Sequence, residues 1–396
     1  MPLKRLPGVL ISLALLAAAA AVIGALSPAA AQTPAAGATL HNGPAPTWRQ
    51  YTVTIPTDRE LYGLFMLDAF EGWAVGGSNG SPVILHYQSG EWWDETPPGI
   101  PATDLYAVHF VSPTLGWAVG DGGTILKYNM GVWLADAVAA PILVPLNTVR
   151  MLSATEGWAA GGNGTFYRYD GSSWSQFTGA SGINNRVVNS LAVLGSANAW
   201  AVGGANQIMG VPALIARFDG STWTAQASVA SKSLNSLSMP TASSGWAVGA
   251  GGVTLRFDGS SWISQTNPLL GLASPPELIA VFASASGKAW AVGNRYPGLD
   301  APTLMLWDAG AWVTETVQLV YSYAYPPSLH AIYMVSDEEG WAVGSEGMIL
   351  RYSVSTELQP TPTPTLSPTR TPTAIPASPT ATRTQTPTNT PTQTST

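Results

Sequence analysis

The sequence predicts an all-β fold: a seven-bladed β-propeller of four-stranded antiparallel blades, closed by an N-terminal strand that completes the last blade. Three observations predict it. One tryptophan motif recurs at a near-constant spacing, and each copy lies among short strand-like segments. In addition, a segment before the first repeat matches the strand that the last repeat lacks. The composition agrees, because glycine (41) and proline (32) are abundant and only 10% of residues are charged, which favours short strands and tight turns.

The repeated tryptophan sets the number of blades. The pentapeptide Gly-Trp-Ala-Val-Gly occurs at residues 72–76, 116–120, 245–249 and 340–344, and three looser copies complete the series. The central tryptophans are Trp73, Trp117, Trp158, Trp200, Trp246, Trp290 and Trp341. Their spacing of 41 to 51 residues fits four short strands per unit, as in a propeller blade.

Within each repeat, short strands alternate with turns. In the second repeat we expect strands over residues 105–110, 116–120 and 124–128, with a tight hairpin at Asp121-Gly122. In several repeats an Asp-Gly-Ser turn then leads into a fourth strand that opens with tryptophan. We expect the turn aspartates to accept hydrogen bonds from backbone amides of their own turns. They are Asp170, Asp219, Asp258 and Asp308.

The two ends of the repeat region complement each other. The seventh repeat stops after its third strand, at residues 348–352, and no fourth-strand tryptophan follows. The missing piece lies before the first repeat, where residues 48–52 (Trp-Arg-Gln-Tyr-Thr) match residues 174–178 (Trp-Ser-Gln-Phe-Thr). An N-terminal strand in the last blade would close the ring and leave no open sheet edge between the first and last repeats.

The segments outside the repeats divide the rest of the chain. A signal peptide is predicted over 1–31. Two basic residues, Lys4 and Arg5, precede an apolar run over 9–26, and small residues at 29–31 suit cleavage. An uncleaved membrane anchor is the alternative, and either places the remainder at the cell surface or outside the cell. A linker over 32–46 precedes the propeller, 47–354. The Thr/Pro-rich tail, 355–396, is expected to be disordered because it cannot bury enough apolar surface to fold.

At its Gly-Trp-Ala-Val-Gly and Asp-Gly-Ser-Ser-Trp repeats, the chain resembles the photosystem II assembly and stability factor family of seven-bladed propellers. Its units also resemble the Asp-box repeats of sialidase-type propellers. The resemblance covers the globular part and implies a cluster of arginines on one surface. This chain instead has one basic residue per blade at a single strand position. These residues form a belt around the propeller and not a cluster, so we do not infer a photosystem role for this chain from the resemblance. The belt positions are Lys127, Arg168, Arg217, Arg256 and Arg351, with His86 and Leu306 as variants.

Several classes of chemistry are not expected. The chain has no cysteine, so disulfides and a cysteine nucleophile are excluded. Its net charge is −7 and no basic tract is present, which argues against nucleic-acid partners. We expect no cofactor, no metal site and a monomer. His109 and His330 fall in first strands, but their register predicts opposite faces of the blade and therefore no shared metal site.

A sialidase-like enzyme would need three convergent arginines, a Tyr–Glu pair and an acid. Tyr62, Tyr106, Glu277 and Glu315 are available, but no motif groups them. The basic residues outside the repeat pattern are interpreted as structural. They are Arg59, Arg150, Arg186, Lys232, Lys288 and Arg295. No catalytic apparatus is therefore predicted.

Residues that depart from the repeat are the best guide to function. The fourth repeat inserts residues 205–212, the sixth inserts 295–300, and a tyrosine-rich loop spans 321–327. Exposed tyrosines give rigid contact area with a polar tip. The predicted binding residues are Tyr296, Asp300, Tyr321, Tyr323 and Tyr325. The expected function is non-catalytic binding of a protein or glycan outside the cell. A sialidase-like hydrolase or lyase, or an assembly factor for a membrane complex, is the alternative.

Overall fold

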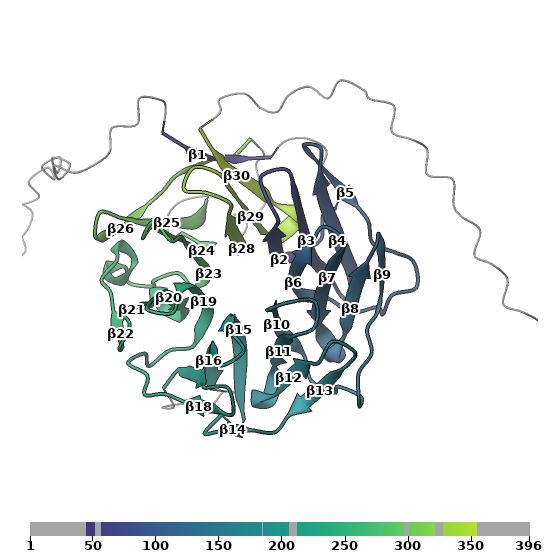
Figure 1. Ribbon diagram of the computed structural model, residues 1–396. Coiled ribbons are helices and arrows are strands. Elements are labelled where there is room, and N and C mark those ends of the chain that lie inside the picture. Colours follow the sequence, from purple (N-terminus) through teal and green to yellow (C-terminus); the bar gives the residue numbers. More distant parts are fainter. Residues whose placement is uncertain are drawn as a thin grey trace, which may run out of the picture. The chain divides into compact units, whose positions relative to one another are not determined.

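The computed structural model describes residues 45–51, 57–183, 185–205, 212–296, 301–320 and 328–354. The chain divides into two units, 1–358 and 359–396, and the second lies outside the described residues, as does the predicted signal peptide. Figure 1 shows seven sheets arranged in a ring around a common axis. The predicted all-β, seven-bladed propeller is confirmed.

The first four blades follow one another along the chain, and the strands of each run outward from the axis in sequence order. Blade one consists of β2 (Leu61–Met66), β3 (Glu71–Ser78), β4 (Ser81–Gln88) and β5 (Glu91–Asp94). Blade two consists of β6 (Leu105–Ser112), β7 (Leu115–Gly120), β8 (Ile125–Asn129) and β9 (Val132–Ala135). Blade three consists of β10 (Leu146–Met151), β11 (Gly157–Gly161), β12 (Phe166–Tyr169) and β13 (Trp174–Phe177). Blade four consists of β15 (Arg186–Gly195), β16 (Asn198–Ala205), β17 (Leu214–Phe218) and β18 (Trp223–Ala225), with β14 (Ala180–Ser181) parallel to β18.

The last three blades complete the ring. Blade five consists of β19 (Leu234–Thr241), β20 (Ser244–Gly249), β21 (Thr254–Phe257) and β22 (Trp262–Ser264). Blade six consists of β23 (Leu278–Ala283), β24 (Ala289–Arg295), β25 (Pro302–Asp308) and β26 (Ala311–Thr314). Blade seven consists of β28 (Leu329–Met334), β29 (Gly340–Gly344), β30 (Ile349–Ser353) and β1 (Thr47–Gln50), with β27 (Val317–Gln318) parallel to β1.

The fourth strand of blade seven comes from the start of the described chain. β1 runs antiparallel to β30, with Trp48 opposite Tyr352, and Figure 1 shows the two strands side by side. Trp48 is 1% exposed, and its Nε1 donates a hydrogen bond to Glu315 Oε2 at 2.8 Å. Main-chain hydrogen bonds therefore join the first and last strands of the propeller, which are about as far apart in the sequence as the domain allows.

The repeated tryptophans form the interfaces between blades. All seven are at most 4% exposed. Trp73 of blade one, for example, stacks on Phe110 of blade two, with ring centroids 3.6 Å apart. A buried indole supplies large apolar area and favourable ring geometry, so each copy of the motif attaches one blade to the next.

The belt of basic residues covers these tryptophans. Each belt residue lies directly across the second and third strands from the tryptophan of its own blade, as Lys127 does from Trp117 and Arg351 from Trp341. The cation lies over the indole ring, with the Arg351 guanidinium carbon 5.1 Å from the Trp341 centroid. In blade one His86 stacks on Trp73 instead, at 4.4 Å. This cation–π geometry explains the Lys or Arg that five of the seven blades carry at this position as part of the architecture.

The Asp-Gly-Ser turns behave as predicted at three positions. Asp170 Oδ1 accepts hydrogen bonds from the backbone amides of Ser172 and Ser173, at 2.9 and 2.8 Å. Asp219 and Asp258 repeat this pattern, and these bonds lower the pKa of each of the three carboxyls to about 2. Asp308 differs, because it accepts from the amide of Ala309 only one residue away.

Candidate functional site

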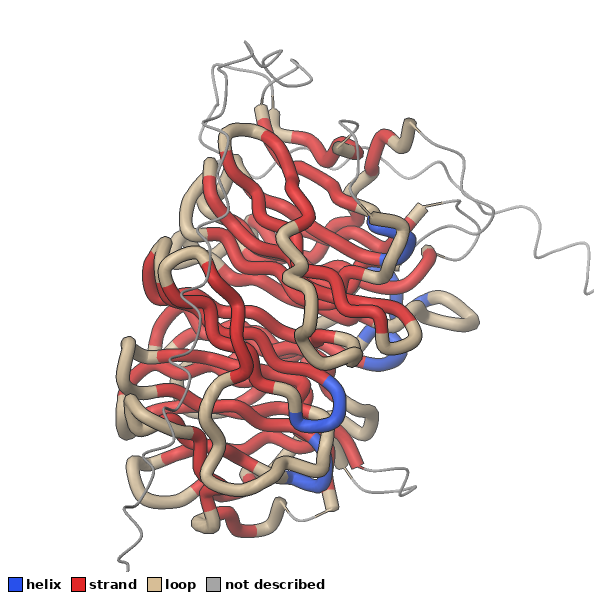
Figure 2. Tube along the Cα trace, turned by 90° about the vertical axis from the view of Figure 1, so that its right-hand side faces the viewer, coloured by secondary structure: helices blue, strands red, loops and turns tan. Residues whose placement is uncertain are grey.

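The first strands of all seven blades enclose a cavity of about 310 Å³ on the propeller axis. We call the face where these strands begin the upper face. The turns between second and third strands lie on it too, because the Asp121 amide donates to the carbonyl of Asp104, which precedes β6. Those turns include η1 (Asp121–Gly123), η2 (Gly162–Gly164), η3 (Ala250–Gly252) and η5 (Ser345–Gly347). Figure 2 shows the helical turns, in blue, gathered on one side of the ring.

Every first strand has an irregularity near its start that determines which side chains reach the cavity. The pairing with the second strand skips one residue in each blade, as between Leu105 and Ala107 in blade two. The skipped residues are Tyr62, Tyr106, Asn147, Asn189, Asn235, Ile279 and His330. Such a bulge reverses the alternation of side chains along a strand. We call these seven residues the upper ring.

Residues three positions further along form a second set, the lower ring. It comprises Phe65, His109, Arg150, Ala192, Ser238, Phe282 and Tyr333, and all of them line the cavity. In a regular strand, residues three apart would face opposite neighbours. The bulge places the upper and lower rings on the same side of each blade, toward the following blade.

The bulge overturns the prediction that His109 and His330 lie on opposite faces. His109 Nδ1 accepts a hydrogen bond from the Met151 amide of the following blade, at 3.4 Å. His330 likewise approaches the following blade, with Nδ1 3.6 Å from Glu60 Oε2. The prediction was wrong because it assumed regular alternation. Rings of blade one lie between the two histidines, since Tyr62 stacks on His330 and Phe65 contacts His109.

Blades three to five form a polar arc of the cavity wall. In the upper ring, Asn147 Nδ2 donates to the Val188 carbonyl at 3.0 Å, and Asn189 Nδ2 donates to the Leu234 carbonyl at 2.9 Å. Asn235 Nδ2 donates to the Leu278 carbonyl and to Glu277 Oε1. In each of these three blades, an asparagine side chain at the same position thus bonds to the backbone of the next blade.

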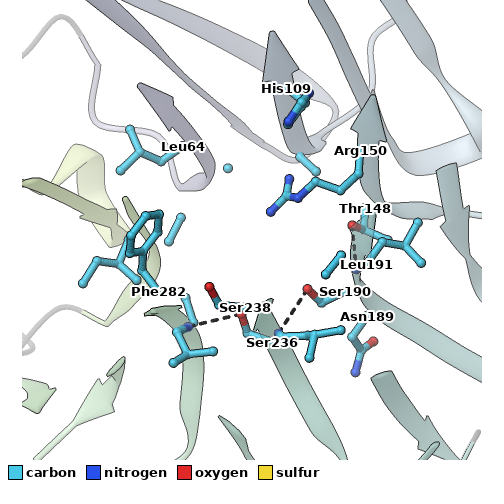
Figure 3. A pocket seen from close by; sticks show the side chains of 18 of the residues that line it. Leu64, His109, Thr148, Arg150, Asn189, Ser190, Leu191, Ser236, Ser238 and Phe282 are labelled. Carbon is cyan, nitrogen blue, oxygen red and sulfur yellow. Dashed lines mark hydrogen bonds between the residues drawn. The ribbon is translucent and has the colours of Figure 1, made fainter. Parts of the chain in front are cut away.

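Hydroxyl groups add a second row of links to the polar arc. Thr148 Oγ1 accepts a hydrogen bond from the Leu191 amide, at 3.3 Å, and Ser190 Oγ accepts from the Leu237 amide, at 3.2 Å. Ser236 Oγ accepts from the Val281 amide at 3.2 Å. Figure 3 shows this row along one side of the cavity. Because these groups already bond to backbone, the arc is rigidly defined.

Blades six, seven, one and two form an aromatic arc opposite. In the upper ring, Tyr62 lies between His330, at 5.3 Å and 16°, and Tyr106, at 5.6 Å. In the lower ring, Tyr333 lies between Phe282 and Phe65, at 5.1 and 5.2 Å. Phe65 in turn contacts His109 at 4.7 Å. Along this part of the cavity wall, ring contacts link neighbouring blades where the polar arc uses hydrogen bonds.

Arg150 projects from the boundary between the arcs, and Figure 3 shows its guanidinium reaching into the cavity. Its Nη1 donates to the Val149 carbonyl at 3.1 Å, and the described residues that line the cavity include no aspartate or glutamate. Burial lowers the pKa of Arg150. Burial, and secondarily the Arg150 charge, lowers the pKa of His109 to about 3. The imidazole is therefore neutral at physiological pH.

The structure places only one of the predicted binding residues. Tyr296 is half-buried and packs against the core cluster between blades five and six that contains Trp246 and Trp307. Asp300, Tyr321, Tyr323 and Tyr325 lie outside the described residues, so that site stays a prediction.

Sequence reasoning treated Arg150, Tyr62 and Tyr106 as ungrouped residues and did not find the cavity. A signal for the upper ring was present, because each of its residues directly follows a buried aliphatic residue that opens or lies near the start of a first strand. The lower ring could not be predicted without knowing where the bulge lies in each first strand.

Among the described ranges, no group of three or more metal-ligating side chains of the His, Cys, Asp or Glu type is present. No helix within the described part of the chain is long and apolar enough to cross a membrane.

No protein-family model matches the sequence, and no curated protein matches it. Solved structures do. The structure of YCF48 bound to D1 peptide has a TM-score of 0.60 and 17% identity, covering 82% of this chain and 99% of that chain. YCF48 from Cyanidioschyzon merolae has a TM-score of 0.58 and 15% identity, covering 78% and 99%. Virginiamycin B lyase from Staphylococcus aureus has a TM-score of 0.60 and 12% identity, covering 78% and 98%. At these identities the shared property is the β-propeller fold.

Proposed function

We propose that this chain is an exported, non-catalytic binding module that takes an extended segment of a protein partner on its upper face, at the mouth of the central cavity. The observation that carries the proposal is the aromatic arc. Tyr62 and Tyr106 are half-buried, the His330 side chain keeps 15% of its area exposed, and the three present ring surface beside the carboxamides of the polar arc. Aromatic and amide groups together suit a peptide backbone with apolar side chains.

The comparisons support a protein partner in one respect. A structure with the same fold carries a peptide, as the description "YCF48 bound to D1 peptide" states. The predicted signal peptide supports a location outside the cytoplasm. We further propose that Tyr296, Asp300, Tyr321, Tyr323 and Tyr325 contribute to the same binding face.

The test removes ring surface from the arc and leaves the buried tryptophans between the blades in place. The double substitution Tyr62→Ser and Tyr106→Ser should lower capture of peptides from a displayed library at least about tenfold, because contact aromatics carry much of the energy of such interfaces. The matched control is Trp93→Ser, which removes a 55% exposed indole on β5, away from the cavity. Equal capture by the double variant and wild type would refute the proposal. Capture from a glycan array alone would assign the face to sugars.

A lyase or hydrolase is the second candidate function, and one observation favours it. The neutral imidazole of His109 lines the same cavity as the Arg150 guanidinium and the Tyr333 hydroxyl, a set of hydrogen-bond donors that could hold a substrate and stabilise an anion formed from it. Incubating the protein with the captured peptides or glycans and measuring their masses separates the two functions. Unchanged masses support binding, and new products support catalysis.

A further inference from the structure

Hydrogen-bond donors without a facing acid surround the lower part of the cavity. Arg150 contributes its guanidinium, whose Nη1 donates to the carbonyl of the preceding residue. Because His109 Nδ1 accepts from the Met151 amide, the proton of its neutral ring is on Nε2, which is then a donor. Ser238 Oγ accepts from the Ala283 amide at 2.9 Å, and its hydroxyl proton remains available to an acceptor.

The charged groups of the cavity wall indicate that the ligand is an anion. The residues that line the cavity include one obligate cation and no carboxylate among the described positions. Arg150 is half-buried, and a guanidinium that loses part of its hydration without a facing carboxylate costs folding free energy. A guanidinium fork matches the two oxygens of a carboxylate and binds them through two parallel hydrogen bonds.

The opposite wall of the cavity indicates the chemistry of the rest of the ligand. Phe282, Tyr333 and Phe65 form a continuous series of ring contacts in the lower ring, and Figure 3 shows Phe282 across the cavity from Arg150. The cavity of about 310 Å³ has the size of a small-molecule site. It would hold a short apolar or aromatic group next to the carboxylate.

We infer that the lower ring is a binding site for a carboxylate that carries an apolar or aromatic group, with Arg150 holding the carboxylate and the Phe282–Tyr333–Phe65 series holding the apolar part. The carboxylate belongs to a small free acid or to the C-terminal residue of a peptide. The second source rests on the proposed function, because the peptide would enter from the upper face. The site itself requires neither a partner protein nor catalysis.

The experiment uses 3-phenylpropanoate as the free acid and 3-phenylpropanamide as its neutral counterpart, with binding measured by NMR line broadening and calorimetry on the full chain. Wild type should bind the acid at least about tenfold more tightly than the amide, because only the acid can accept both guanidinium bonds. Arg150→Gln should remove this preference. The matched control Arg168→Gln changes a guanidinium of the same blade that lies over Trp158, outside the cavity, and should keep the preference.

A second arm uses the tripeptide Gly-Gly-Phe with a free or an amidated C-terminus. Preference for the free C-terminus, lost in Arg150→Gln, assigns the site to chain ends. Binding of phenylpropanoate alone assigns it to small acids and leaves the proposed partner binding to its own test. Equal affinity of wild type for acid and amide, in both arms, would overturn the inference even if the Arg150 variant failed to fold.

Discussion

The interfaces between blades and the wall of the central cavity use the same seven repeats in opposite ways. At the interfaces every repeat supplies the same buried tryptophan, from Trp73 to Trp341. At the cavity wall the equivalent positions of the repeats carry different residues, among them Arg150, Ser238 and Phe282. Positions that repeat build the ring, and positions that vary make one side of its axis polar and the other aromatic. A ligand site is therefore expected at the varying positions.

The largest effect should come from removing the strand that completes the ring. Deleting residues 32–54 removes β1, exposes β30 and leaves Tyr352 without its contact to Trp48. Loss of the buried indole alone costs about 3–5 kcal/mol, so thermal unfolding followed by circular dichroism should show a strongly lowered melting temperature. Deleting residues 32–43 alone is the control and should leave the melting temperature unchanged. An equal melting temperature in both deletions would show that β1 is dispensable.

A single interface tryptophan should have the next largest effect. Trp246 is 2% exposed and contacts Trp307 and Trp312 at 4.7 and 4.9 Å. Trp246→Ala should lower the free energy of unfolding by about 3–5 kcal/mol, as other large truncations in cores do. This is measured by denaturant titration.

The control for that substitution is Trp93→Ala, at a position that is 55% exposed. It should cost less than about 1 kcal/mol, because little apolar area is removed from the core. Equal losses at both positions would contradict the distinction between interface and surface tryptophans.

The turn aspartates should give a smaller effect that depends on pH. The pKa values of Asp170, Asp219 and Asp258 fall from 3.8 to about 2 on folding. The unfolded chain therefore binds more protons than the folded chain between these values, and stability decreases as pH falls through this window. The triple Asp→Asn variant should lose less stability than wild type between pH 5 and pH 2, as measured by melting temperature at each pH. Parallel curves for the two proteins would show that these carboxyls are not held by their turns.

How far the sequence predicts this molecule differs between the same two regions. The spacing of the tryptophans and the displaced segment at residues 48–52 were enough to predict the blades, because both express the repeat directly. The cavity was missed because its geometry depends on the bulge at Tyr106 and its counterparts, which the one-dimensional pattern does not reveal. Because the prediction assumed regular alternation and not that bulge, it placed His109 and His330 on opposite faces. The aspartate turns lie between these cases, since three followed the repeat and Asp308 did not.

The central claim is that Arg150, at a varying position of the cavity wall, serves a ligand and not the fold, and Arg150→Met tests it most directly. Methionine keeps the apolar stem and removes an unneutralised charge, which is often neutral or stabilising in buried positions. We predict a melting temperature equal to wild type within about 2 °C, or higher, together with loss of the preference for 3-phenylpropanoate over its amide. A melting temperature lower by many degrees, with that preference retained, would show that Arg150 is part of the scaffold and would contradict the account.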